Sequence, residues 1–345
     1  MKSLVAGVAA ALLVGTLAGC APSAESSVPT ATAAAPAPRP TPITAAPAVS
    51  VPAMPRAAFK ADCTVVATDA EVSDAIGGPV VAEPYSGDVM PDWMVQSLGG
   101  IRCAWTPADG IGAWVTVIPV AAAGQDIVDD AGDGEPACYG GEFDAGYQDA
   151  CSFSTTVGEW WYAGVVYTAP DSGIDATDAI DELVADLGTR AAAHAAEVPA
   201  NLDGAWTDTP DCDALDESVD TTPIGLDLEA VVGNQPEEAG PGFWGAVAAT
   251  GEQTCYWEES DGVALATTEI LPGGWWVIDR QSQDTGAAPV AIDGALRALR
   301  VPDADGSASE TLYVTDGVNL VTARGTLDAE QLGALAVLVM NGVAG

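Results

Sequence analysis

The stretch Arg102-Cys103-Ala104-Trp105 recurs in the second half of the chain as Thr254-Cys255-Tyr256-Trp257. Each copy is followed by a turn and then by a segment, 113–120 or 263–271, in which apolar and β-branched residues alternate. Because side chains point to opposite faces of a strand in turn, this period of two predicts a half-buried strand. The recurrence therefore predicts that the chain contains two copies of one design.

The residues upstream of each Cys-x-Trp support the duplication. Each copy opens with an Asp-Cys pair, at 62–63 and at 211–212. In the first copy, Thr68-Asp69-Ala70-Glu71 has the form of a capping box, which predicts a short helix that stops at the next glycines. We expect the matching helix of the second copy over 226–232, which is also followed by a glycine.

The residues downstream also match. Both copies contain two alternating segments joined by a short turn, and an Asp-Gly between strands is a strong hairpin signal. Both then close with a long helical segment. The expected hairpins are 151–156 with 160–167 and 311–315 with 318–323, and the expected closing helices are 176–196 and 328–341.

These patterns predict an α+β fold made of two similar domains. Each domain is expected to be an antiparallel sheet with flanking helices on one face, tied by disulfides. The expected boundaries are 60–197 for the first domain, 198–210 for a linker and 211–345 for the second domain.

Six cysteines follow Cys20, an even number that suits a disulfide framework in an oxidising compartment. Six cysteines allow 15 pairings, but the duplication favours one bridge at the same place in each copy. The expected pairs are Cys63 with Cys103, Cys212 with Cys255, and Cys138 with Cys151 as a local bridge in the first copy.

The N-terminus has the form of an export signal. Lys2 precedes an uncharged apolar run from Leu4 to Leu17, which is shorter than the roughly 20 residues that a membrane span needs. The run leads into Leu17-Ala18-Gly19-Cys20, which resembles the lipobox of bacterial lipoproteins. That resemblance implies a signal peptide over 1–19, a diacylglycerol and palmitate on Cys20, and residence on the outer face of the cell membrane.

Residues 20–59 are rich in Ala, Pro, Thr and Ser and carry few charges. Such a segment buries too little apolar surface to offset the entropy of ordering, and Pro-rich chain is extended. We expect it to be a disordered tether that holds the domains away from the lipid bilayer.

The order Asp-Cys, short helix, Cys-x-Trp and antiparallel strands resembles an uncharacterised domain family of actinobacterial secreted lipoproteins. The resemblance implies that the paired cysteines tie the first helix to the sheet, as in Cys63 with Cys103. It also implies the lipobox and the tether. It implies no activity, ligand or catalytic residue.

The charge balance restricts the partners. The chain has 50 acidic and 10 basic residues, a net charge of −40 at pH 7. Without basic clusters it is not expected to bind nucleic acid, and anionic lipid headgroups should repel it. Membrane attachment is therefore expected to depend on the lipid of Cys20.

Few residues suit catalysis. The single histidine, His194, lies near the end of the closing helix of the first copy, where a helix dipole favours it, and no Gly-x-Ser-x-Gly or zinc motif occurs. No cofactor and no metal site are expected. Two carboxylates would suffice for glycoside hydrolysis, but the many acidic residues nominate no pair.

Adjacent tryptophans are the remaining candidates. Trp160-Trp161 and Trp275-Trp276 should place indoles on opposite faces of a strand, so one of each pair would enter the core. The other would face a ligand, or would be covered by helices or by the second copy. The sequence thus predicts a non-enzymatic envelope lipoprotein that binds an unknown ligand or partner through these aromatic residues or a groove between the copies. A hydrolase of wall glycan and an accessory of another envelope protein are the alternatives.

Overall fold

The computed structural model describes residues 54–85, 89–107, 112–132, 136–140, 149–169, 172–197, 199–200, 202–233, 240–302 and 310–345. The expected signal peptide, Cys20 and the tether as far as residue 53 lie outside the described residues.

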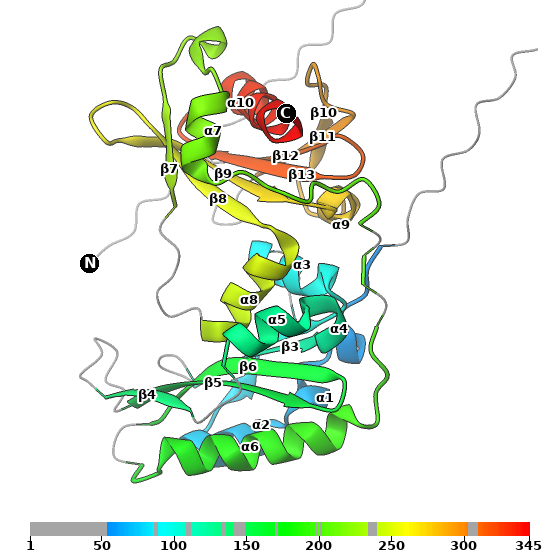
Figure 1. Cartoon of the computed structure of the whole chain (residues 1–345), viewed down its shortest axis with the longest axis vertical. Coiled ribbons are helices and arrows are strands. Elements are labelled where there is room, and N and C mark those ends of the chain that lie inside the picture. Colours follow the sequence, from blue (N-terminus) through cyan, green and yellow to red (C-terminus); the bar gives the residue numbers. More distant parts are fainter. Residues whose placement is uncertain are drawn as a thin grey trace, which may run out of the picture. The chain divides into compact units, whose positions relative to one another are not determined.

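Each half of the described chain is built on an antiparallel sheet (Figure 1). The first sheet has six described strands in the order β1-β2-β3-β6-β5-β4. The second has seven, in the order β10-β11-β12-β13-β9-β8-β7. Read from β7, the second sheet repeats the strand order of the first and adds β10 at its far edge. The α+β class and the two similar antiparallel sheets are therefore confirmed.

The helices and strands follow the same succession in both copies. The first copy contains η1 (Ala58–Ala61), α1 (Cys63–Val66), α2 (Asp69–Ile76), β1 (Val81–Ala82), α3 (Met90–Ser97), β2 (Ile101–Thr106), β3 (Ala113–Pro119), α4 (Val120–Ala123), α5 (Gln125–Asp130), β4 (Ala137–Gly140), β5 (Asp149–Val157), β6 (Trp160–Tyr167) and α6 (Ala176–Ala191). The second contains α7 (Cys212–Ser218), η2 (Thr222–Ile224), β7 (Glu229–Val232), α8 (Gly240–Thr250), β8 (Gln253–Glu258), β9 (Ala264–Leu271), η3 (Gly274–Trp276), α9 (Val277–Gln281), β10 (Ala288–Val290), β11 (Arg297–Pro302), β12 (Glu310–Thr315), β13 (Leu320–Gly325) and α10 (Ala329–Ala344).

The Asp-Cys pair starts a helix in both copies. The Asp62 carboxylate accepts a hydrogen bond from the backbone N–H of the second helical residue of α1, and Asp211 accepts one at the start of α7. A capping aspartate satisfies an N–H that has no partner within the helix. The cysteine that follows is then the first helical residue, which places it beside the sheet.

The disulfides have the expected pairing. Cys63 is bonded to Cys103, Cys212 to Cys255, and Cys138 to Cys151. The first two join α1 to β2 and α7 to β8, and the third joins opposite residues of β4 and β5. The aromatic residues of the two Cys-x-Trp motifs, Trp105 and Trp257, are fully buried in the same cores as these bridges.

The helix expected over 226–232 is wrong. Residues 229–232 form the edge strand β7, which pairs with β8. Val231 and Val232 are β-branched and favour a strand, and the helix of this copy begins earlier, directly at Cys212. The two copies therefore both place a helix at the Asp-Cys pair.

The tether ends earlier than residue 59. The Gln96 side chain donates a hydrogen bond from Nε2 to the Pro55 carbonyl at 2.7 Å, and the Ala58 N–H donates to the Gly100 carbonyl at 3.0 Å. Ala58 and Phe59 are buried in the first core. The folded part thus includes residue 55 onwards.

The expectation of helices on one face of each sheet is also wrong. α1, α2 and α6 cover one face of the first sheet, and α7 and α10 cover one face of the second. The opposite faces of both sheets contribute to a third, shared core together with α3, α4, α5, α8 and α9. Figure 1 shows these helices between the two sheets. The two copies therefore form one layered unit.

Glycines let α8 of the second copy lie directly on the first sheet. A Cβ atom added to Gly242 would lie 2.7 Å from the Thr116 Cβ on β3, and one added to Gly245 would overlap the Trp161 indole on β6. Only a hydrogen side chain permits backbone to approach this closely. The helix in turn buries Trp161, whose Nε1 donates to the Ser154 hydroxyl at 2.9 Å.

Gly245→Ala should test this contact. The added methyl group must displace Trp161 or the helix, so we expect the free energy of unfolding to fall by about 1–3 kcal/mol. Ala248→Leu, on the exposed side of the same helix, should change it by less than about 0.5 kcal/mol. Chemical denaturation measures both, and an unchanged Gly245→Ala protein would show that α8 does not lie on this sheet.

Candidate functional site

The two copies differ at the helix that precedes β2 in one copy and β8 in the other. When the copies are aligned on Cys103 and Cys255, Trp93 of α3 takes the place of Gly245 of α8. Gly245 brings its helix against the first sheet. Trp93 instead reaches the second sheet through its side chain, and its ring lies in a T-shaped arrangement against Tyr313 of β12, with centroids 5.8 Å apart.

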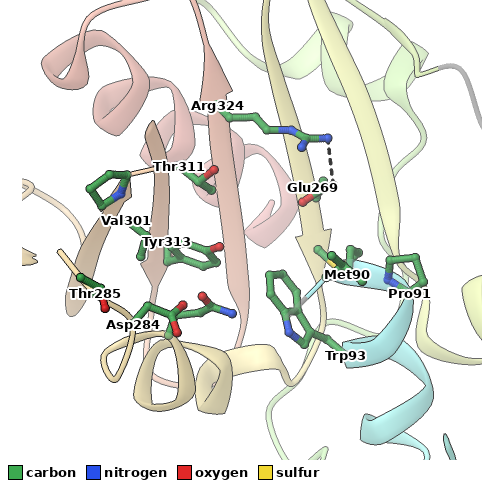
Figure 2. A pocket seen from close by; sticks show the side chains of 13 residues that line it. Met90, Pro91, Trp93, Glu269, Asp284, Thr285, Val301, Thr311, Tyr313 and Arg324 are labelled. Atoms are coloured by element: carbon green, nitrogen blue, oxygen red, sulfur yellow. Dashed lines mark ion pairs between the residues drawn. The ribbon is translucent and has the colours of Figure 1, made fainter. Parts of the chain in front are cut away.

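This difference leaves a groove between α3 and the exposed part of the second sheet. The groove has a volume of about 900 Å³, within the range of small-molecule sites. Figure 2 shows α3 on one side of it and the strands of the second sheet on the other. The residues that line it are Val89, Met90, Pro91, Trp93, Glu269, Gln281, Asp284, Thr285, Val301, Pro302, Thr311, Tyr313 and Arg324.

An ion pair lies at one end of the groove. The Arg324 Nη2 lies 3.6 Å from the Glu269 Oε1, and the dashed line in Figure 2 marks this pair. The other carboxylate oxygen of Glu269 accepts a hydrogen bond from the Thr322 hydroxyl at 2.9 Å. Glu269 is largely enclosed, whereas the Arg324 side chain is 56% exposed. The guanidinium is therefore the accessible member of the pair.

A buried amide also lines the groove. Gln281, the last residue of α9, is 2% exposed and lines the groove. Its Nε2 has no hydrogen-bond partner among the described residues. Buried polar groups in native proteins are nearly always hydrogen-bonded, so this donor points to an acceptor that the described residues do not supply.

A second buried carboxyl lies near Glu269 but does not line the groove. Glu252, just before β8, is 4% exposed and accepts a hydrogen bond from the Thr254 hydroxyl at 2.6 Å. Thr254 lies directly opposite Glu269 in the β8–β9 register. Burial, reinforced by the negative charge of Glu269, raises the pKa of Glu252 to about 7. Its Oε2 has no partner among the described residues.

The tryptophans nominated from the sequence are buried. Trp160 lies in the first core and Trp161 in the core shared by the copies, so the second copy covers the face on which a ligand was expected. Trp275 and Trp276 lie in the short helix η3 rather than on a strand, which corrects that expectation, and both are buried in the shared core. None of the four lines the groove.

Trp160 lies beside residues near the end of α6 rather than in the groove. With His194 it lines a smaller pocket of about 240 Å³, and its Nε1 donates to the His194 carbonyl at 3.4 Å. The His194 ring lies edge-on to Phe59, with centroids 5.1 Å apart. His194 is thus packed against aromatic rings after the helix end.

The residues of the groove were not found from the sequence. Trp93 is one of several apolar residues in a short helix, so nothing in that segment distinguishes it. Arg324 and Glu269 are far apart in the chain. An alignment of the copies on their cysteines would have shown Trp93 opposite a glycine. That exchange of a large side chain for none is the one signal that the sequence carries.

Over the parts of the chain that are described, no cluster of three or more His, Cys, Asp or Glu residues could hold a metal ion. None of the helices there has the length and apolar character needed to span a membrane.

No protein-family model, no curated protein and no solved structure matches the chain.

The raised pKa of Glu252 makes stability depend on pH. Its value is about 7 in the folded protein and about 4.5 in the unfolded chain, so the folded state keeps a proton that the unfolded chain loses. This stabilisation is complete below pH 4.5 and is lost as the pH rises through 7. We expect a loss on the order of 3 kcal/mol.

Glu252→Gln should remove this loss. The difference in free energy of unfolding between wild type and variant, measured by denaturation from pH 4 to pH 8, should move by that amount in favour of the variant. Glu259→Gln, at an exposed position, should keep the wild-type profile. Parallel profiles for wild type and Glu252→Gln would contradict the assignment.

Proposed function

We propose that the chain is a cell-envelope lipoprotein, held to the outer face of the membrane by a diacylglycerol on Cys20, that binds a ligand in the groove between its two copies without chemical conversion. The observation that carries the binding proposal is the groove itself, where Trp93 of one copy meets Tyr313 of the other and the Gln281 Nε2 has no hydrogen-bond partner among the described residues.

The proposed location rests on the sequence of the N-terminus and on the cysteines. Cys20 follows an apolar run in the lipobox arrangement. Three disulfides in the folded part suit a compartment outside the cytoplasm. Because two acyl chains anchor a protein far more firmly than one, a diacylated Cys20 would suffice without a basic patch.

The groove favours binding over hydrolysis. An acid-based glycosidase needs a protonated acid and a second carboxylate that both reach the scissile bond. Glu252 has the raised pKa of such an acid, and Glu269 lies near it. However, Glu252 is buried and does not line the groove, so of these two acids a ligand there would meet Glu269 only. The other carboxylate that lines the groove, Asp284, lies toward the opposite end from Glu269 (Figure 2).

The shape and lining of the groove also favour a small ligand over a flat contact with another protein. An accessory of another envelope protein would be expected to present a broad apolar patch. The apolar lining of the groove, Met90, Trp93 and Val301, is instead mixed with an amide, two carboxylates and a guanidinium. Pockets of this kind, apolar with a few polar groups, are typical of small-molecule sites.

Lipidation can be tested directly. A bacterial host grown with an alkyne-labelled palmitate should incorporate the label into the wild-type chain, which should sediment with membranes. Cys20→Ala should lose the label and leave the membrane fraction, whereas Cys138→Ser should keep both. Unlabelled wild-type protein, or label retained by Cys20→Ala, would refute the anchor.

Binding in the groove can be tested by filling it. Thr311 lines the groove, and the indole of Thr311→Trp should occupy space that a ligand needs. Calorimetric titration with envelope lipids, wall fragments and short peptides should identify a ligand whose affinity falls at least about tenfold in this variant. Thr189→Trp, exposed on α6, should bind as wild type does. If every detected ligand binds Thr311→Trp normally, the groove is not the site.

A further inference from the structure

The groove offers a buried hydrogen-bond donor that needs an acceptor. The Nε2 of Gln281 is enclosed in the groove wall without a partner among the described residues. An amide nitrogen donates two hydrogen bonds and accepts none. A ligand that fills the groove must therefore present an oxygen to Gln281.

A second donor group, the guanidinium of Arg324 on β13, also lines the groove. The guanidinium of Arg324 carries five N–H groups, and its pair with Glu269 involves one nitrogen at 3.6 Å. Figure 2 shows Arg324 and Glu269 at one end of the groove and Asp284 near the other. The ligand therefore meets a donor, the Arg324 guanidinium, at one end of the groove and an acceptor, the Asp284 carboxylate, near the other.

Aromatic and aliphatic surface lies between these polar groups. Trp93, Tyr313, Val301 and Met90 contribute to it although each is at most 9% exposed, and the T-shaped contact of the two rings fixes their orientation. A sugar ring combines an apolar C–H face with hydroxyl groups at its edge, and this combination matches aromatic side chains flanked by hydrogen-bonding groups.

The charges of the groove disfavour an anion. Two carboxylates, Glu269 and Asp284, and one cation, Arg324, line it, in a chain of net charge −40. An anionic ligand would be repelled both locally and at long range. An uncharged ligand escapes this repulsion.

The floor of the groove also disfavours an extended peptide. Such peptides gain affinity by adding a strand to the edge of a sheet. Tyr313 and Thr311 lie on β12, which is paired with β11 on one side and β13 on the other. The strand has no open edge, so recognition there depends on side chains.

We propose that the groove binds an uncharged oligosaccharide. Its hydroxyl or acetamido oxygens accept hydrogen bonds from Gln281 Nε2 and from the Arg324 guanidinium. The apolar face of a sugar ring packs against Val89 and Pro91 and against the small exposed parts of Trp93 and Tyr313. This inference rests on the proposed function, because it names the class of ligand for the same groove.

The test uses the full-length protein in detergent micelles and two soluble probes, the trimer of N-acetylglucosamine and the trimer of glucose. Isothermal titration calorimetry should give a Kd below about 1 mM for at least one trimer. Gln281→Leu should weaken that binding at least tenfold, and Arg324→Gln should weaken it as well. Gln283→Leu, an exposed glutamine on the turn after α9, is the matched control and should bind as wild type does.

Two results overturn the inference. One is that neither trimer binds at millimolar concentration. The other is that a trimer binds equally well to Gln281→Leu, with circular dichroism showing that this variant is folded. If a peptide or a lipid binds instead and Thr311→Trp blocks it, the groove remains a binding site but the ligand class is wrong. If Thr311→Trp blocks nothing that binds, the proposed function itself fails.

Discussion

Each sheet in this protein has two apolar faces, but the helices next to it in the same copy cover only one of them completely. Ile118 and Trp161 on the first sheet and Leu299 and Leu320 on the second would otherwise face water. Burying these faces against a shared layer of helices removes that apolar area from solvent, the main favourable contribution to folding. The shared core therefore dictates that the two copies form one unit.

The shared layer is not symmetric, and the asymmetry creates the site. On the first sheet, Gly242 and Gly245 let α8 lie directly on the strands. On the second sheet, α3 makes its ring contact through Trp93, and the space beside that side chain is the groove. A helix thus lies directly on the first sheet, whereas a cavity with polar and apolar lining remains between the corresponding helix and the second sheet. Glu269 lines that cavity, whereas the buried Glu252 does not.

Local signals in the sequence predicted much of the fold. The recurrence of Asp-Cys and Cys-x-Trp predicted the duplication. It also predicted the disulfides, because two copies of one fold carry their paired cysteines at equivalent positions. Alternation predicted the strands around 113–119 and 264–271. The segment 226–232 was misassigned because its apolar residues suit a short helix or a strand equally well, and only pairing with β8 decides between them. Trp275 and Trp276 were placed on a strand for the same reason.

The site itself could not be predicted in this way. Its residues come from α3, α9 and four strands, and they meet only when both copies are packed together. The partner that covers Trp161 is likewise a helix from the other copy, so no pattern near Trp161 reveals its burial. A site formed by contacts between the copies can be detected in the sequence only through positions at which the two copies differ.

Those differences have a consequence for how such a site can arise. In a homodimer of identical chains, a twofold axis makes the two contacts between helix and opposite sheet identical. A glycine that let one helix lie directly on a sheet would therefore do the same for the other. Here Gly245 and Trp93 occupy corresponding positions of covalently linked copies and can vary independently. Covalent linkage of two copies thus allows one helix to close against its sheet while the corresponding helix of the other copy leaves a groove.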